Sequence, residues 1–135
     1  MFADTSGWAS AVDRRQTYHV LAGALVQQAH ALGQIILTTN YVLAELTALL
    51  SRPLRIPRHQ QILFLTDLRT ASWVQVVPID AALEAAAWQL WTSRPDKEWT
   101  LVDCASFVMM RQRWLTEALT TDHHLEQAGF IRLLK

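Results

Sequence analysis

The chain has 135 residues with 12 basic and 12 acidic side chains, so its net charge is zero when the histidines are neutral. This balance excludes a polybasic arm or an acidic tail, and a hydrophobic content of 51% excludes a disordered chain. Polar residues interrupt every apolar stretch before the roughly 18 residues that a membrane span needs, so we expect no membrane segment. The single cysteine, Cys104, and an N-terminus without a secretory signal predict a cytoplasmic protein.

The apolar and turn-forming residues predict short strands that alternate with helices. In the first half of the chain, the predicted elements are a strand ending at Asp4, helices over 8–12 and from Tyr18 to about Leu32, a strand over 35–37, a helix capped by Asn40 and ended by Pro53, and a helix around 62–68. In the second half, they are a strand over 74–78, a helix capped by Asp80, a helix from Leu101 to Arg113 capped by Thr100, and strands over 118–121 and 130–134.

This order of elements is typical of an α/β fold. Short apolar strands between helices predict a central, mostly parallel sheet of about five strands, flanked by helices on both faces. No repeat, low-complexity tract or long linker divides the chain. We therefore expect residues 1–135 to form a single domain.

Two aspartates follow predicted strands. Asp4 comes directly after the first strand, and Asp122 follows the strand that ends at Thr121. Ligands of doubly wound sheets bind at the carboxyl ends of the strands, so both positions suit a functional site. An ordinary role is also open for each, because the segment from Asp4 to Gly7 is good turn chemistry and Asp122 can cap a helix.

Two further carboxylates lie on predicted helices. Glu45 stands at the edge of the apolar stripe of its helix, where it reaches either a site or water. Asp103 is the only strongly ionisable side chain in LVDCASFVMM, and a charge in such an apolar helix needs a partner or a metal ion. A carboxylate in a first helical turn also stabilises the helix by about 0.3–1 kcal/mol, so a structural role for Asp103 stays open.

We expect these four carboxylates to meet at one rim of the sheet. Like charges a few ångströms apart repel strongly unless cations bind between them. Carboxylates and water molecules are ligands that suit Mg²⁺ or Mn²⁺, whereas no set of cysteines or histidines here has the arrangement of a zinc site. The sequence therefore predicts a divalent-cation site built from acidic side chains.

These segments resemble a PIN domain, in particular the single-domain VapC toxin ribonucleases of bacterial toxin–antitoxin pairs. The resemblance rests on Asp4-Thr5-Ser6, Glu45 in TTNYVLAELTALL, Asp103 in TLVDCASFVMM and Asp122 in LTTDHHLEQAGF, and it spans nearly the whole chain. It implies one PIN domain over residues 1–135 and an Mg²⁺- or Mn²⁺-dependent endoribonuclease. It also implies an RNA substrate, an antitoxin protein that blocks the site, and a homodimer.

The resemblance also implies the roles of individual residues. The implied catalytic and metal-binding residues are Asp4, Glu45, Asp103 and Asp122, with Ser6 as the small hydroxyl residue that orients a carboxylate or a metal-bound water. Asp4 and Asp103 are the principal ligands in this hypothesis, and the other two acids hold a second cation or its waters. Thr121 has only a supporting role. The reaction is in-line attack of water on an RNA phosphodiester, and it leaves a 5′-phosphate and a 3′-hydroxyl.

The chain departs from the family pattern at two positions. Only three residues precede Asp4, fewer than relatives usually have, and a short first strand is expected to hold Asp4 more loosely. Some family members carry another aspartate one turn after the third acidic residue. Phe107 occupies that position here, so no additional ligand is expected there.

Arginines and aromatic residues are candidates for RNA contacts. Arg outnumbers Lys ten to two, and its planar guanidinium suits phosphate, although a solvated helix end is the commoner role. Each of the six tryptophans is expected to pack in the core, with Trp99 as the one to test for RNA contact. His123 and His124 lack a third ligand and helical spacing, which predicts a surface pair.

Two other functions stay open at this stage. Haloacid-dehalogenase-like phosphohydrolases also place a catalytic aspartate after the first strand, but they need a second acid two residues later, where this chain has Ser6. A catalytically inactive PIN-like module that binds a protein partner would keep the fold without using the acidic rim. The sequence does not specify which RNA is cut or which antitoxin binds.

Overall fold

The computed structural model describes residues 1–135 and contains five strands and seven helices. In chain order the elements are β1 Phe2–Ala3, α1 Thr5–Val12, α2 His19–Ala31, β2 Ile36–Thr39, α3 Asn40–Ser51, α4 Arg58–Thr70, β3 Val74–Val77, α5 Ala81–Ser93, α6 Leu101–Gln112, β4 Glu117–Leu119, α7 His123–Gln127 and β5 Ile131–Arg132. None of the helices combines the length and the apolar character needed to cross a membrane.

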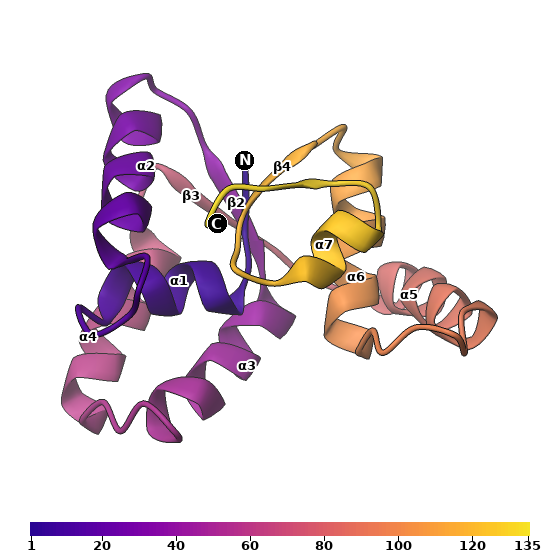
Figure 1. Ribbon diagram of the computed structural model, residues 1–135, viewed down its shortest axis with the longest axis horizontal. Helices are drawn as coiled ribbons and strands as arrows, with labels where there is room; N and C mark the ends of the chain where they lie inside the picture. The colour runs from indigo at the N-terminus through magenta and orange to yellow at the C-terminus, as the bar shows by residue number, and fades with distance from the viewer.

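All five strands form one parallel sheet in the order β3-β2-β1-β4-β5. Figure 1 shows α1 to α4 on one side of this sheet and α5 to α7 on the other. The predicted α/β fold with helices on both faces is therefore confirmed, and the sheet is wholly rather than mostly parallel. The chain moves outward from β1 through β2 to β3 and then returns to β4 on the other side of β1, so the order of strands reverses between β1 and β4. In open α/β sheets, this reversal is where ligands bind.

The centre of the sheet is buried because its strands are short and apolar. Both residues of β1 are fully buried, and Phe2 pairs with Leu37 of β2 and Ala118 of β4. Trp8 on α1 and Phe107 on α6 are also fully buried, on opposite faces of the sheet. Helices on both faces thus fix the carboxyl end of β1 in a rigid core.

A close approach of backbones brings α1 against β4. A Cβ atom at Gly7 would lie only 1.9 Å from the backbone oxygen of Leu119, a separation that no side chain tolerates. Glycine at this position therefore lets the first turn of α1 lie directly beside the end of β4. The residues that follow β1 and β4 consequently lie side by side at the carboxyl end of the sheet.

The start of α3 differs from the prediction. Thr39, not Asn40, caps this helix, because the Thr39 hydroxyl accepts a hydrogen bond from the Val42 amide at 3.1 Å. Asn40 is the first helical residue, and its side-chain oxygen accepts a hydrogen bond from the Ile79 amide at 2.7 Å. The Asn40 side chain therefore joins α3 to the segment that follows β3. The predicted caps Asp80 and Thr100 are confirmed.

Candidate active site

The four acidic residues singled out in the sequence line one cleft of about 250 Å³. They come from four separate segments: the end of β1, the middle of α3, the first turn of α6 and the segment after β4. The other side chains of the cleft are Thr5, Ser6, Val42, Leu49, Val102, Ser106 and Leu125. A larger hollow of about 560 Å³ beside α3 and α4 has no acidic residue, so the acidic chemistry belongs to the smaller cleft.

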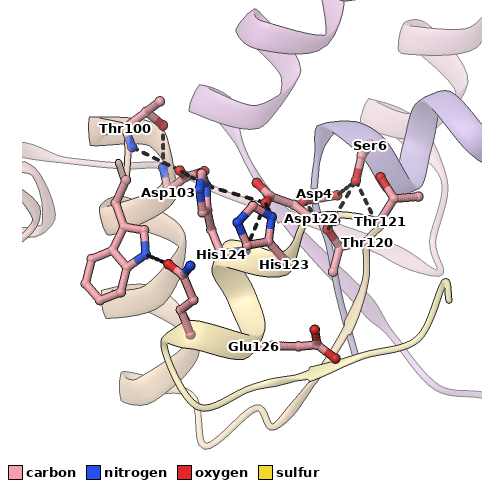
Figure 2. A network of polar contacts seen from close by, with 12 residues as sticks. Asp4, Ser6, Thr100, Asp103, Thr120, Thr121, Asp122, His123, His124 and Glu126 are labelled. Atoms are coloured by element: carbon pink, nitrogen blue, oxygen red, sulfur yellow. Dashed lines mark hydrogen bonds and ion pairs between the residues drawn. The ribbon is translucent and has the colours of Figure 1, made fainter. Parts of the chain in front are cut away.

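Asp4 is held by three hydrogen bonds at the start of α1. Its Oδ1 accepts from the Ser6 hydroxyl at 2.8 Å and from the Gly7 amide at 2.9 Å, and its Oδ2 accepts from the Thr120 hydroxyl at 2.5 Å. Figure 2 shows this network between the residues after β1 and those after β4. The expectation that a short first strand holds Asp4 loosely is wrong, because these three donors fix its carboxylate.

Ser6 and Thr120 connect the two strand ends. Their hydroxyl oxygens lie 3.1 Å apart, and each also accepts a backbone hydrogen bond at 2.9 Å, Ser6 from the Thr121 amide and Thr120 from the Asp122 amide. Thr120 is fully buried. The hydroxyl group after β4 that donates a hydrogen bond to Asp4 is therefore that of Thr120. The sequence had suggested a supporting role for Thr121 instead.

The surroundings of Asp4 favour its neutral form. Removal of its carboxyl group from water is the largest effect and raises the pKa of Asp4 from 3.8 to about 6. The hydrogen bonds from Thr120, Gly7 and Ser6 act in the opposite direction, and the charge of Asp122 raises the pKa further. An ionised Asp4 is therefore costly here unless positive charge is close by.

Asp103 combines a structural contact with a place in the cleft. Its Oδ2 accepts a hydrogen bond from the Thr100 amide at 2.9 Å, and its own amide donates to the Thr100 hydroxyl at 3.1 Å, which together form a capping box. Partial removal from water raises the pKa of Asp103, and the nearby charge of Asp122 adds to this effect. Asp103 thus stabilises its helix and still lines the acidic cleft.

Glu45 and Asp122 complete the acidic lining. The Thr5 hydroxyl donates a hydrogen bond to Glu45 Oε1, which ties the exposed carboxylate of α3 to the first turn of α1. Asp122 caps α7, since its Oδ1 accepts a hydrogen bond from the His124 amide at 2.9 Å. Asp103 and Asp122 therefore each stabilise the start of a helix and also line the cleft.

No basic side chain of the lysine or arginine type lines the cleft. The salt bridges of the structure give no Lys or Arg partner to any of the four acidic residues, and only histidine rings approach Asp103 and Asp122. Four carboxylates that line one cleft without a Lys or Arg partner repel one another when ionised, and a bound cation would offset this repulsion. The donor set consists of hard oxygen atoms and therefore fits Mg²⁺ or Mn²⁺.

Trp99, the tryptophan singled out for a test of RNA contact, is buried, as core packing predicts. It is only 4% exposed, its Nε1 donates a hydrogen bond to Gln127 Oε1 at 3.0 Å, and its ring packs edge-on against Phe107. Its role is to join the loop before α6 to α7. Core packing is confirmed for Trp8 and Trp99, but it is wrong for Trp88, Trp91 and Trp114, which are exposed.

The histidine pair after Asp122 also differs in part from the prediction. His123 has a side chain that is 63% exposed, as expected for a surface residue, whereas that of His124 is only 17% exposed. Nδ1 of His124 lies 3.4 Å from Oδ2 of Asp103 and 3.4 Å from Oδ1 of Asp122. The sequence did not reveal that His124 lies beside Asp103 and Asp122, because helical spacing rules do not relate a residue to one two positions before it.

Comparison with known proteins places the chain in a class. The family model of the PIN domain matches residues 1–131, and the chain belongs to the PIN-domain family. Its fold agrees with this assignment, since a crystal structure at 28% identity superposes on 96% of the chain.

The most informative relative is VapC20 of Mycobacterium tuberculosis, described as a 23S rRNA-specific endonuclease. The chain is 29% identical to it over 133 residues, which cover 98% of this chain and 97% of VapC20. The crystal structure of VapC20, described as a sarcin–ricin loop cleaving toxin, superposes with a TM-score of 0.84 at 28% identity, covering 96% of this chain and 95% of that one. A chain of the FitAcB crystal structure from Neisseria gonorrhoeae superposes with a TM-score of 0.66 at 14% identity, covering 97% and 94%, and shows the shared fold. The predicted resemblance to VapC-like PIN-domain ribonucleases is confirmed.

Proposed function

We propose that this protein is a divalent-metal-dependent endoribonuclease in which Asp4, Glu45, Asp103 and Asp122 are the metal-binding and catalytic acids. The observation that carries the proposal is their convergence in one cleft without a basic partner. The full-length similarity to an endonuclease supports the same reaction class. Residues 1–135 act as a single PIN domain in this proposal.

Each side chain has a definite task in the proposed reaction. Asp4 and Asp103 are the principal ligands of a cation, and Glu45 and Asp122 hold a second cation or its waters. A bound Mg²⁺ or Mn²⁺ supplies activation of water and neutralisation of charge on the phosphate. Ser6 orients Asp4 by donating a hydrogen bond to its Oδ1.

Thr120 and Thr5 are additional positioning residues that the sequence analysis did not identify. Thr120 donates to the other oxygen of Asp4, so the Asp4 carboxylate is fixed in its rotation by two hydroxyl groups. Thr5 fixes Glu45 in the same way from the start of α1. A carboxylate that is held before the cation arrives loses less entropy on binding.

The other functions considered lack support in the site. Ser6 occupies the position where a haloacid-dehalogenase-like enzyme needs an acid, and it donates a hydrogen bond to Asp4 instead. A catalytically inactive module has no need for four carboxylates in one cleft without a Lys or Arg partner.

The proposed partners follow from the relatives. We propose that the substrate is RNA, with the 23S rRNA loop cut by VapC20 as the first candidate. We also propose an antitoxin that covers the acidic cleft, a homodimer in solution, and action in the cytoplasm. Light scattering of the purified protein tests the dimer.

The test of the proposed function is sequencing of RNA ends after controlled expression of the wild-type chain and of Asp4→Asn. The expected result is a small set of new 5′-phosphate ends in RNA from the wild-type culture that are absent with the variant. Identical RNA ends in both cultures, with both proteins folded and expressed, contradict the proposal.

A further inference from the structure

Three consecutive residues after β4 place two imidazole rings and a carboxylate side by side. Oδ1 of Asp122 lies 3.7 Å from Nδ1 of His123 and 3.4 Å from Nδ1 of His124. One donor atom from each of the three side chains lies within 4.8 Å of the others, and the ring centroids are 4.4 Å apart. Figure 2 shows both rings beside Asp122, with the ring of His124 between Asp103 and Asp122.

The two separations between the Asp122 carboxylate and the imidazole rings are close to those expected for ligands of one metal ion. Two ligands that each lie about 2.1 Å from an ion are about 3.0 Å apart at a right angle and about 3.4 Å apart at a tetrahedral angle. The contact of Asp122 with His124 falls in this range, and the contact with His123 exceeds it by a few tenths of an ångström. A small rotation of the exposed His123 side chain therefore brings its donor toward the position set by Asp122 and His124.

The cluster is held in place by the short helix that it begins. The His124 amide donates to Asp122 Oδ1 at 2.9 Å, so the carboxylate is turned toward the two rings. Leu125, the next residue, is fully buried and anchors α7 in the core. The ring of His19, by contrast, contacts the Ser10 carbonyl at 2.9 Å, whereas the polar contacts of His123 and His124 are with carboxylates.

The chemistry of these donors differs from that of the acidic cleft. Imidazole nitrogen suits first-row transition ions such as Co²⁺, Ni²⁺ and Zn²⁺, whereas Mg²⁺ prefers oxygen ligands and retains much of its water. We propose that Asp122, His123 and His124 form a transition-metal site that adjoins the acidic cleft and shares Asp122 with it. The two imidazole ligands play no part in the proposed nuclease reaction, and only Asp122 is common to the two sites.

A purely electrostatic role is the competing explanation for the two histidines. Protonated rings would then pair with Asp103 and Asp122, whose oxygens lie 3.4 Å from His124 Nδ1, and no metal ion would be selected. The two explanations differ in one measurable quantity, which is the affinity of the metal-free protein for a nitrogen-preferring ion.

The test is a titration of metal-free protein with Co²⁺ in the presence of excess Mg²⁺, followed by visible absorption and by calorimetry. We expect the wild-type chain to bind one Co²⁺ more tightly than Mg²⁺. His123→Gln and His124→Gln should each weaken Co²⁺ binding by at least about tenfold, because each removes one of three protein ligands. Asp4→Asn should retain the Co²⁺ site, since Asp4 is not part of it.

His59→Gln is the matched control, because His59 is an exposed histidine on α4 and is distant in the fold from α7. It should leave Co²⁺ affinity unchanged. Equal Co²⁺ affinity in the wild-type chain and in the two folded variants of the cluster overturns the proposal. Should His124→Gln fail to fold by circular dichroism, the exposed His123 alone decides the outcome. Neither result involves RNA cleavage, so a failure here leaves the nuclease proposal standing.

Discussion

The two sides of the acidic cleft are held in different ways. On the β1 side, Asp4 receives hydrogen bonds from Ser6, Gly7 and Thr120, and its pKa is raised to about 6. On the α7 side, Asp122 accepts a single backbone hydrogen bond, and its side chain is 29% exposed. One side is thus fixed and costly to ionise, while the other is open to solvent. The difference indicates that the fixed side determines the geometry of the site and the open side admits ligands.

The largest effect on RNA cleavage should come from removing one of the two principal ligands of the proposed cation. Asp4→Asn and Asp103→Asn are each expected to reduce RNA cleavage by at least about 1000-fold, because the loss of one ionised ligand removes most of the attraction for the cation. Gel-based cleavage assays measure this. Asp96→Asn is the matched control, since Asp96 is exposed, pairs with Arg94 and lies outside the cleft. A variant with an altered ligand that retains near wild-type cleavage is incompatible with the assigned roles.

The stability of the metal-free protein should show the cost of the fixed side. Folding raises the pKa of Asp4 from 3.8 to about 6, so the folded state binds this proton more tightly than the unfolded state. The stabilisation is complete well below the unfolded pKa of 3.8 and is lost as the pH rises through about 6. Relative to Asp4→Asn, the wild-type chain should therefore lose about 3 kcal/mol of unfolding free energy between about pH 3 and about pH 7.

Urea denaturation of both proteins at several pH values, in the presence of a chelator, measures this difference. Asp4→Asn is expected to be the more stable protein at pH 7 without metal. Addition of Mg²⁺ should stabilise the wild-type chain more than the variant, because the ion binds only the folded state. A constant difference between the two proteins across the pH range contradicts the raised pKa of Asp4.

A smaller effect is expected from the hydroxyl group that orients Asp4. Thr120→Val removes the donor to Asp4 Oδ2 while keeping the shape of the side chain, and should reduce cleavage about 10- to 100-fold. Thr121→Val is the control, because Thr121 is the next residue and its hydroxyl group has no acidic partner. Thr121 makes its hydrogen bonds to Ser6 and Arg132 through its backbone, which the substitution leaves in place. Equal activity of the two variants would show that Asp4 does not depend on Thr120.

The smallest effect is expected at the hydrogen bond from Trp99 to Gln127, which joins the loop before α6 to α7. Trp99→Phe removes the hydrogen bond to Gln127 and should lower the free energy of unfolding by about 1 kcal/mol, as is typical of one neutral hydrogen bond. RNA cleavage should stay near the wild-type level, because the ring is buried. A large loss of RNA affinity without a loss of stability would restore Trp99 as an RNA contact.

The sequence sufficed for the parts of the molecule that follow local rules. Apolar runs between turn residues predicted all five strands, and the reversal of strand order explains why Asp4 and Asp122 meet after β1 and β4. Asp103 was recognisable because it is a charge in an apolar helix. These features depend on periodicity and on strand ends, which a single sequence records.

The contacts between distant segments could not be predicted. Thr120 and Asp4 are separated by 116 positions, so only the folded backbone shows that they meet. Trp99 lies in the loop before α6, as predicted, but its partners Phe107 and Gln127 could not be read from the sequence. The helix α7 is too short to show an apolar periodicity in the sequence. The hydrogen bond from the His124 amide to the Asp122 carboxylate, which caps this helix, was therefore not predicted.

A metal-replacement assay on purified protein tests most directly whether the four carboxylates bind a cation that is needed to cleave RNA. Protein treated with a chelator is mixed with 23S rRNA, and cleavage is followed while Mg²⁺ or Mn²⁺ is added. We expect no cleavage without the ion, recovery when it is added back, and no recovery for Asp4→Asn at any ion concentration. Full cleavage in the presence of the chelator, or equal recovery for Asp4→Asn, would contradict this expectation.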